Sequence, residues 1–208
     1  MNKSLKYILV VIIIAIVLFC GYVYYIFSSF SFGSDKVYSK KELIDNYKKR
    51  SDILYSLKNY YNRLVPSDKI VEIEFENDKE IARLAVTNLK PSSSNYSDQY
   101  FCDWNLGIHS KQVDSVIQSL KWKRETLTEI KSWLDKANCI GIINGEPTNI
   151  WFQRSGFGMY SYEIFSNPIS DTLKSNYNDS CRYIFYNDKV VLEYGGGAVG
   201  PQCFPDED

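Results

Sequence analysis

The chain has 208 residues, with 24 Lys and Arg against 25 Asp and Glu, so its formal net charge is −1. This balance offers no broad basic surface, and we therefore expect no nucleic-acid binding. The 17 Tyr, 11 Phe and 4 Trp favour sheet structure and supply amphipathic side chains for a core or a contact surface.

The N-terminal segment Tyr7–Phe27 is uncharged and rich in Ile and Val. About 20 such residues in a helix cross a hydrocarbon core of about 30 Å. Lys3 and Lys6 precede the segment, and tyrosines near its end suit the membrane interface. We predict that residues 7–27 contact the lipid bilayer as a single-pass signal anchor, within an anchor and tether spanning 1–34. A cleaved secretory signal is the alternative, but its apolar core is normally shorter, about 7–15 residues.

The orientation of this anchor is not decided by lysines, which are balanced on its two flanks. The short N-terminal tail and the four cysteines of residues 35–208 favour an exterior body, because disulfides form in oxidising compartments. Richness in Asn, Lys, Ile and Tyr suggests an AT-rich bacterial genome. We predict one domain over residues 35–208 outside the bacterial inner membrane, with the N-terminus in the cytoplasm. Buried thiols in a cytoplasmic domain are the alternative.

A first helix is predicted from Ser39 to the residue before Pro66, because its apolar residues recur at spacings of three and four. Its polar face carries Lys48, Lys49 and Arg50. Near a bilayer, such a cluster contacts anionic headgroups with about 1 kcal/mol per charge. A solvated helix face is the alternative interpretation.

The segment Ile70–Glu76 alternates apolar residues with Glu72, Glu74 and Glu76, which predicts a half-buried antiparallel strand. A turn at 77–78 leads into a second strand, Ile81–Leu89. We expect the three carboxylates to lie on a wet strand face, without a catalytic role.

A polar loop is predicted over Lys90–Tyr100, and a second helix over Ser110–Lys136. Apolar residues at sevenfold spacing give this helix one continuous stripe. The stripe is interrupted at 123–124, so we favour packing on the chain's own sheet over a coiled-coil partner.

Short strands with close turns follow, which predicts an antiparallel meander. Only the link 167–180 has room for a helical turn. The predicted fold class is α+β, with two main helices packed on a mostly antiparallel sheet of a hairpin plus a meander. The expected strands of the meander are Cys139–Ile143, Thr148–Arg154, Gly158–Phe165, Cys181–Tyr186 and Lys189–Tyr194.

No catalytic or metal-binding motif is recognisable. His109 is the single histidine, and no nucleophile accompanies it in a known pattern. The cysteines are scattered singly, which predicts no metal site. The glycine-rich segment 195–201 lacks the Lys-Ser/Thr of a phosphate loop, and we predict no cofactor.

Trp, Tyr and Arg dominate binding hot spots, so residues of these types are the candidate binding residues. The sequence does not identify which carboxylates converge, so catalytic residues stay unknown. The candidates are Trp104, Trp151, Arg154, Tyr160 and Tyr162.

Disulfide connectivity follows from helix length if four cysteines form two bridges. An unbroken helix over 110–136 is about 40 Å long, and Cys102 and Cys139 flank its opposite ends. Their connecting segments are too short to bring their Cα atoms within about 7 Å. Two pairings remain: 102–181 with 139–203, or 102–203 with 139–181.

The leading functional hypothesis is a membrane-anchored, non-enzymatic binding or interaction module with a protein partner. The alternative is a membrane-tethered hydrolase that uses paired carboxylates, recognisable by a pocket with two carboxyl groups about 5–10 Å apart. A lipid-facing structural protein that uses 48–50 is a third hypothesis.

Overall fold

The computed structural model describes residues 12–24, 36–90, 100–156, 158–195 and 200–205. The chain divides into two compact units, Met1–Lys36 and Val37–Asp208.

In the first unit, residues 12–24 are helical. Among the described residues, no helix combines the length and apolarity that a membrane crossing needs. The predicted anchor, residues 7–27, extends beyond the described helix at both ends, and it stays a prediction.

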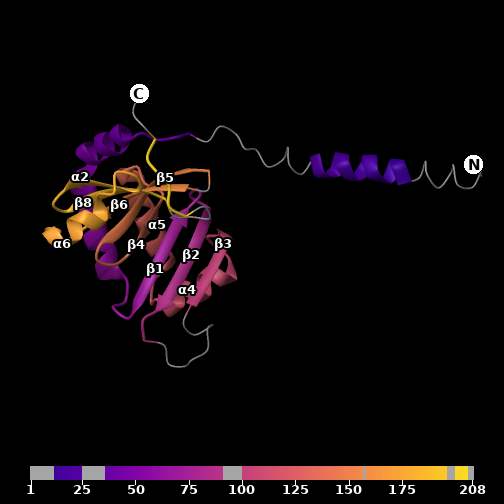
Figure 1. Cartoon of the computed structure of the whole chain (residues 1–208). Coiled ribbons are helices and arrows are strands. Elements are labelled where there is room, and N and C mark those ends of the chain that lie inside the picture. Colours follow the sequence, from indigo (N-terminus) through magenta and orange to yellow (C-terminus); the bar gives the residue numbers. More distant parts are fainter. Residues whose placement is uncertain (1–11, 25–35, 91–99, 157, 196–199, 206–208) are drawn as a thin grey trace, which may run out of the picture. The chain divides into compact units, whose positions relative to one another are not determined.

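The second unit contains one eight-stranded antiparallel sheet with the order β3-β2-β1-β4-β5-β6-β8-β7, so the predicted α+β class is confirmed. Strands β1, β2 and β3 lie side by side in Figure 1. The strands are β1 (Lys69–Phe75), β2 (Glu80–Asn88), β3 (Tyr100–Gly107), β4 (Gly141–Ile143), β5 (Thr148–Ser155), β6 (Gly158–Ile164), β7 (Tyr183–Asn187) and β8 (Val190–Gly195). The helices are α2 (Lys40–Leu64), α4 (Lys111–Ser119), α5 (Arg124–Ala137), α6 (Asp171–Lys174) and the 3₁₀ turn η1 (Ser175–Tyr177).

The first predicted helix is confirmed as α2, and its ends have local causes. Ser39 and Glu42 form a capping box, in which each side chain bonds the other's backbone N–H. The helix ends at Leu64, just before Pro66, because proline disfavours helical backbone in the preceding residue. Non-helical dihedrals at Arg50 mark a kink.

The predicted unbroken helix over 110–136 is wrong, because it is two helices, α4 and α5. Lys121 adopts the left-handed conformation with φ 58°, which ends α4. The next residue, Trp122, is buried, and its indole Nε1 donates to the Leu64 carbonyl at the end of α2 over 3.2 Å. Docking of this indole therefore accompanies the break in the helix.

Strand β3 is a strand that the sequence analysis missed. It pairs antiparallel with β2 from Tyr100 to Gly107 and forms one edge of the sheet. The preceding residues 91–99 of the predicted loop lie outside the described residues. The predicted hairpin is therefore a three-stranded unit.

The predicted antiparallel meander is confirmed for β4, β5 and β6, which pair in chain order. The last two strands depart from it, since β6 pairs with β8 and leaves β7 at the edge. The link between β6 and β7 contains α6 and η1, as its length predicted.

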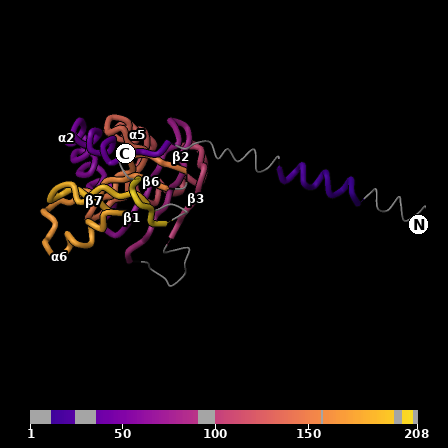
Figure 2. Tube along the Cα trace, turned by 45° about the horizontal axis from the view of Figure 1, so that its top comes forward, coloured from indigo at the N-terminus to yellow at the C-terminus, as the bar shows by residue number. Residues whose placement is uncertain are grey.

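The core lies between the helices and one face of the sheet. Buried side chains of α2, α4 and α5 form one cluster with inward-facing residues of the strands. Figure 2 shows α2 and α5 together on one side of the strands. The strand members of this cluster include Val71, Ile73, Leu84, Val86, Ile150, Tyr160, Tyr162 and Leu192. Alternate residues of the same strands point to the opposite side, which we call the polar face.

Both predicted disulfide pairings are wrong. Cys181 and Cys203 form a disulfide with Cα atoms 4.1 Å apart. Phe204 donates its backbone N–H to the Cys181 carbonyl, which places the C-terminal segment beside the start of β7. Cys102 and Cys139 are unpaired, so the assumption that all four cysteines form bridges was wrong.

Candidate functional site

The polar face is built by strand register. Glu72 of β1 is opposite Ile143 of β4, and Ile143 is opposite Asn149 of β5. On the same face, Trp151 is opposite Ser161 of β6. Directly opposite residues in antiparallel strands point to the same side, so side chains from distant segments converge here.

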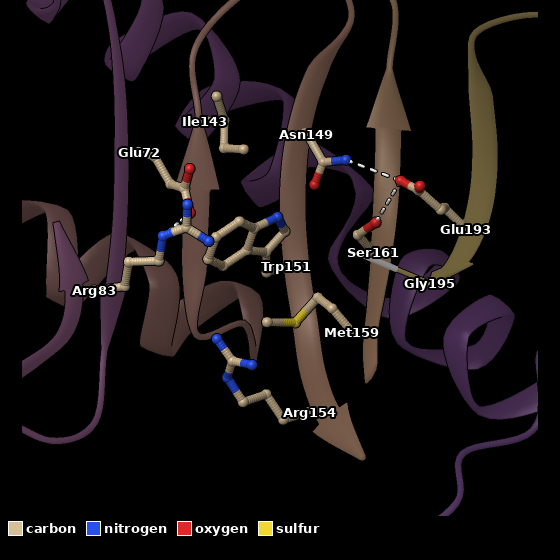
Figure 3. A pocket seen from close by; sticks show the side chains of 10 residues that line it. All are labelled: Glu72, Arg83, Ile143, Asn149, Trp151, Arg154, Met159, Ser161, Glu193 and Gly195. Atoms are coloured by element: carbon tan, nitrogen blue, oxygen red, sulfur yellow. Dashed lines mark hydrogen bonds and ion pairs between the residues drawn. The ribbon is translucent and has the colours of Figure 1, made fainter. Parts of the chain in front are cut away.

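A pocket of about 220 Å³ lies on this face (Figure 3). Its residues come from six different strands. They are Glu72, Arg83, Ile143, Asn149, Trp151, Arg154, Met159, Ser161, Glu193 and Gly195.

The Trp151 ring is placed by the glycine opposite it. Gly141 pairs with Trp151, and a Cβ at Gly141 would lie 2.7 Å from Cε3 of that ring. Any larger residue at this position would collide with the indole and with the backbone oxygen of Ile73 at 2.8 Å. Because Gly141 has no side chain, the Trp151 indole can lie close against the sheet and form part of the pocket wall.

Two ion pairs hold carboxylates beside the pocket. Arg154 binds Glu74 through Nε to Oε1 and through Nη2 to Oε2. Such a two-point contact compensates the burial of Glu74, which is 2% exposed. Arg182 likewise donates from Nε and Nη2 to Glu193 Oε1. The expected wet strand face is thus wrong for Glu74, which is buried and paired.

Arg83 and Glu72 form a looser pair. Arg83 Nε lies 2.8 Å from Glu72 Oε1, yet the N–H does not point at the oxygen, and both atoms are buried without an aligned hydrogen bond. The guanidinium carbon lies 4.7 Å from the centroid of the Trp104 ring. Burial raises the pKa of Glu72 although Arg83 acts against that shift.

Two glutamates share one amide at the β5–β6–β8 side of the site. Asn149 Nδ2 donates to Glu163 Oε1 over 2.6 Å and to Glu193 Oε2 over 3.1 Å. Ser161 Oγ also donates to Glu193 Oε2. Burial and the negative charge of Glu193 raise the pKa of Glu163 to about 8. Glu163 therefore holds a proton at neutral pH, as expected for two adjacent carboxyl groups.

Three of the five predicted binding residues lie on the polar face. Trp151 and Arg154 line the pocket, and Trp104 lies beside Arg83 with 50% of its surface exposed. Tyr160 and Tyr162 point to the other side of the sheet and are 0% exposed. These two tyrosines belong to the core under α2 rather than to an accessible surface.

The other sequence candidates lie elsewhere. Lys48 and Lys49 are exposed on α2, whereas Arg50 donates to Asn46 Oδ1 over 2.9 Å; their contact with a membrane stays a prediction. His109 is exposed after β3. Residues 196–199 of the glycine-rich segment are outside the described part. Within the described ranges, no group of three or more His, Cys, Asp or Glu is arranged to hold a metal ion.

A second cluster surrounds the buried Lys58 of α2, which is 2% exposed. Its ammonium contacts Glu146 Oε2 at 3.2 Å and Ser166 Oγ at 2.6 Å, beside a cavity of about 500 Å³. Burial raises the pKa of Glu146, but bonds from Ser166 and Lys58 outweigh it and lower the pKa overall. Lys58 Nζ donates to both Glu146 and Ser166, and the Ser166 hydroxyl itself donates to Glu146 Oε2, so the hydrogen bonds of the cluster join its own members. We therefore interpret the cluster as a structural contact that holds α2 against the sheet.

Comparisons with protein families, with curated proteins and with solved structures found no match to this chain. Sequence analysis missed Asn149, Ser161, Glu163, Arg182 and Glu193, because polar residues on strands are common. In β6, Ser161 and Glu163 alternate with buried tyrosines. This alternation was the one signal in the sequence for a polar face at this strand.

Proposed function

We propose that the chain is a membrane-anchored, non-enzymatic binding module, displayed on the outer face of a bacterial inner membrane, and that its ligand contacts the polar face. The observation that supports this proposal most strongly is a group of buried polar atoms without hydrogen bonds at one pocket. Of the four buried side-chain N or O atoms without a hydrogen bond in the described residues, three belong to this pocket: Glu72 Oε1, Arg83 Nε and Asn149 Oδ1.

A buried polar atom left without any partner costs about 1–3 kcal/mol and is rare in folded proteins. Asn149 Oδ1 is such an atom, whereas Glu72 Oε1 and Arg83 Nε have only an ion pair of 2.8 Å without hydrogen-bond alignment. Their gathering at one cavity supports a site that a ligand completes. Trp104 beside the pocket supplies an exposed aromatic surface of the kind that dominates binding energy.

The proposed location has two supports. The uncharged run 7–27 has the length and composition of an anchor. The Cys181–Cys203 disulfide suits a body outside the cytoplasm, because such bonds persist in oxidising compartments.

Photo-crosslinking in living bacteria tests the binding function. A photoreactive amino acid replaces Trp104 on the polar face of the full-length protein, and a matched variant carries it at Gln118, an exposed position on α4. We expect a discrete adduct with a cell-envelope component from position 104 and none from position 118. Absence of adducts from position 104, or equal adducts from both positions, would reject the polar face as the contact surface.

A second candidate function is a membrane-tethered hydrolase that uses paired carboxylates. The Glu163 and Glu193 pair supports it, because enzymes hold one carboxyl group neutral and its neighbour ionised for acid and base roles. Glu193 lines the pocket, whereas Glu163 does not.

Hydrolysis of chromogenic glycosides and esters by the purified full-length protein tests this candidate. If the pair is catalytic, Glu193→Gln should lower turnover by at least about 100-fold, the usual contribution of an acid or base group. Turnover that is absent, or that the substitution leaves unchanged, would reject the hydrolase.

A further inference from the structure

We propose that the pocket on the polar face binds one ring of a neutral saccharide. This inference rests on the proposed binding function and names the chemical class of its ligand. It follows from the charges, the unpaired atoms and the size of the pocket.

The charged groups of the site are already matched with one another. Arg154 is bound to Glu74, and Arg182 is bound to Glu193. The remaining charged groups of the pocket, Arg83 and Glu72, lie within 2.8 Å of each other. An ionic ligand would have to break one of these pairs and leave a buried charge without its partner, which is costly. A neutral ligand leaves all three pairs intact.

Three pocket atoms without an aligned hydrogen bond suit a ligand that both donates and accepts. Asn149 Oδ1 has no hydrogen-bond partner, whereas Glu72 Oε1 and Arg83 Nε have only their ion pair with each other. A donor suits either oxygen, and an acceptor suits the Arg83 N–H. A hydroxyl group supplies one donor and two acceptor positions. Neighbouring hydroxyls on one molecule therefore satisfy all three atoms, with Glu72 and Arg83 close enough to share one hydroxyl.

The shape and lining of the pocket favour a single ring. Its volume of about 220 Å³ is below the range of about 300–1,000 Å³ that drug-sized ligands occupy. Figure 3 shows the Trp151 ring between Arg83, Asn149 and Met159. Trp151 and Met159 are 8% and 5% exposed, so the exposed edge of each side chain offers a small apolar contact to the C–H side of a sugar ring, while its hydroxyls reach the polar atoms.

Saturation-transfer NMR with the full-length protein tests the proposal, in a detergent that has no sugar headgroup. The probes are glucose and N-acetylglucosamine, with glycine as a zwitterion of comparable polarity. We expect saturation transfer to at least one sugar and none to glycine. Asn149→Ala and Glu72→Ala should each weaken sugar binding at least tenfold, whereas His109→Ala, at an exposed position outside the pocket, should not change it.

Thermal melts of each variant show whether the fold is kept, and Ser161→Ala provides a milder change at the pocket if Asn149→Ala fails to fold. Ser161→Ala should then weaken sugar binding more than His109→Ala does. Transfer to glycine alone, or no transfer to either sugar at about 10 mM, would overturn the saccharide assignment. If crosslinking from Trp104 persists in that case, the binding function stands and only the ligand class is wrong. Sugar binding that no pocket variant weakens would overturn the site.

Discussion

Substitution of Glu163 by Gln should change how stability depends on pH. Burial and Glu193 raise the pKa of Glu163 from 4.5 to about 8, so between these values the folded protein keeps a proton that the unfolded chain has lost. The unfolded state then binds fewer protons, and stability falls as pH rises, with a limiting slope of about 1.4 kcal/mol per pH unit. The contribution is fully present below pH 4.5 and is lost by about pH 8.

Glu163→Gln cannot ionise. Its amide oxygen still accepts from Asn149, and its amide N–H takes the place of the acid proton in the side-chain hydrogen bond with Glu193, which also helps to raise the pKa of Glu163. We expect the variant to lack this slope, so that its free energy of unfolding exceeds that of the unmodified protein increasingly from pH 5 to pH 8. Urea unfolding of residues 35–208 at several pH values measures it. The matched control is Glu76→Gln, at an exposed position on the turn after β1. Parallel pH curves for Glu163→Gln and the unmodified protein would refute a proton shared by the two buried glutamates.

Four further predictions concern the body and its attachment. Removal of residues 1–34 should give a soluble monomer that unfolds cooperatively in urea; insolubility would contradict the one-domain organisation. A reporter enzyme that is active only outside the cytoplasm should work when fused after Asp208, and a well-expressed silent fusion would reverse the orientation. Non-reducing peptide mapping should recover Cys181 joined to Cys203, and free thiols at both positions would argue for a reducing compartment. Gly141→Ala should destabilise the body by about 1–3 kcal/mol in urea unfolding, because the added methyl meets a ring carbon at 2.7 Å; an unchanged midpoint would show that the ring can move.

Local chemistry was sufficient to predict some of the regular elements, among them α2 and β1. The two ends of α2 were predicted from the sequence. The helix begins after the capping residue Ser39 and ends before Pro66. The strict alternation of Ile70–Glu76 likewise predicted β1. The apolar stripe is interrupted at 123–124, next to the observed break between α4 and α5, but the interruption alone did not predict two helices. The Trp122 indole docks at the end of α2, a contact between residues far apart in the chain that the local pattern does not contain.

Strand β3 escaped prediction for a related reason. Asp103 and Asn105 interrupt its pattern and have low strand propensity, and Asn105 even adopts a positive φ of 53°. The strand exists because β2 offers it a paired edge over almost its whole length. Tertiary pairing here outweighs local preference.

The pairing register of the strands decides which polar side chains meet at the site, although each strand by itself shows only an alternation of polar and apolar residues. Glu74 alternates with apolar neighbours as a solvent-facing residue would, and its position in β1 gives no hint of burial. It becomes 2% exposed because Arg154, 80 residues later, lies within reach on the same face and neutralises it. The same logic applies to Glu163 and Glu193, which converge on Asn149 only because β6 pairs with β8 instead of β7. Had the meander continued in chain order, Glu193 would be one strand farther from Asn149, and the shared amide that holds the two glutamates together could not form.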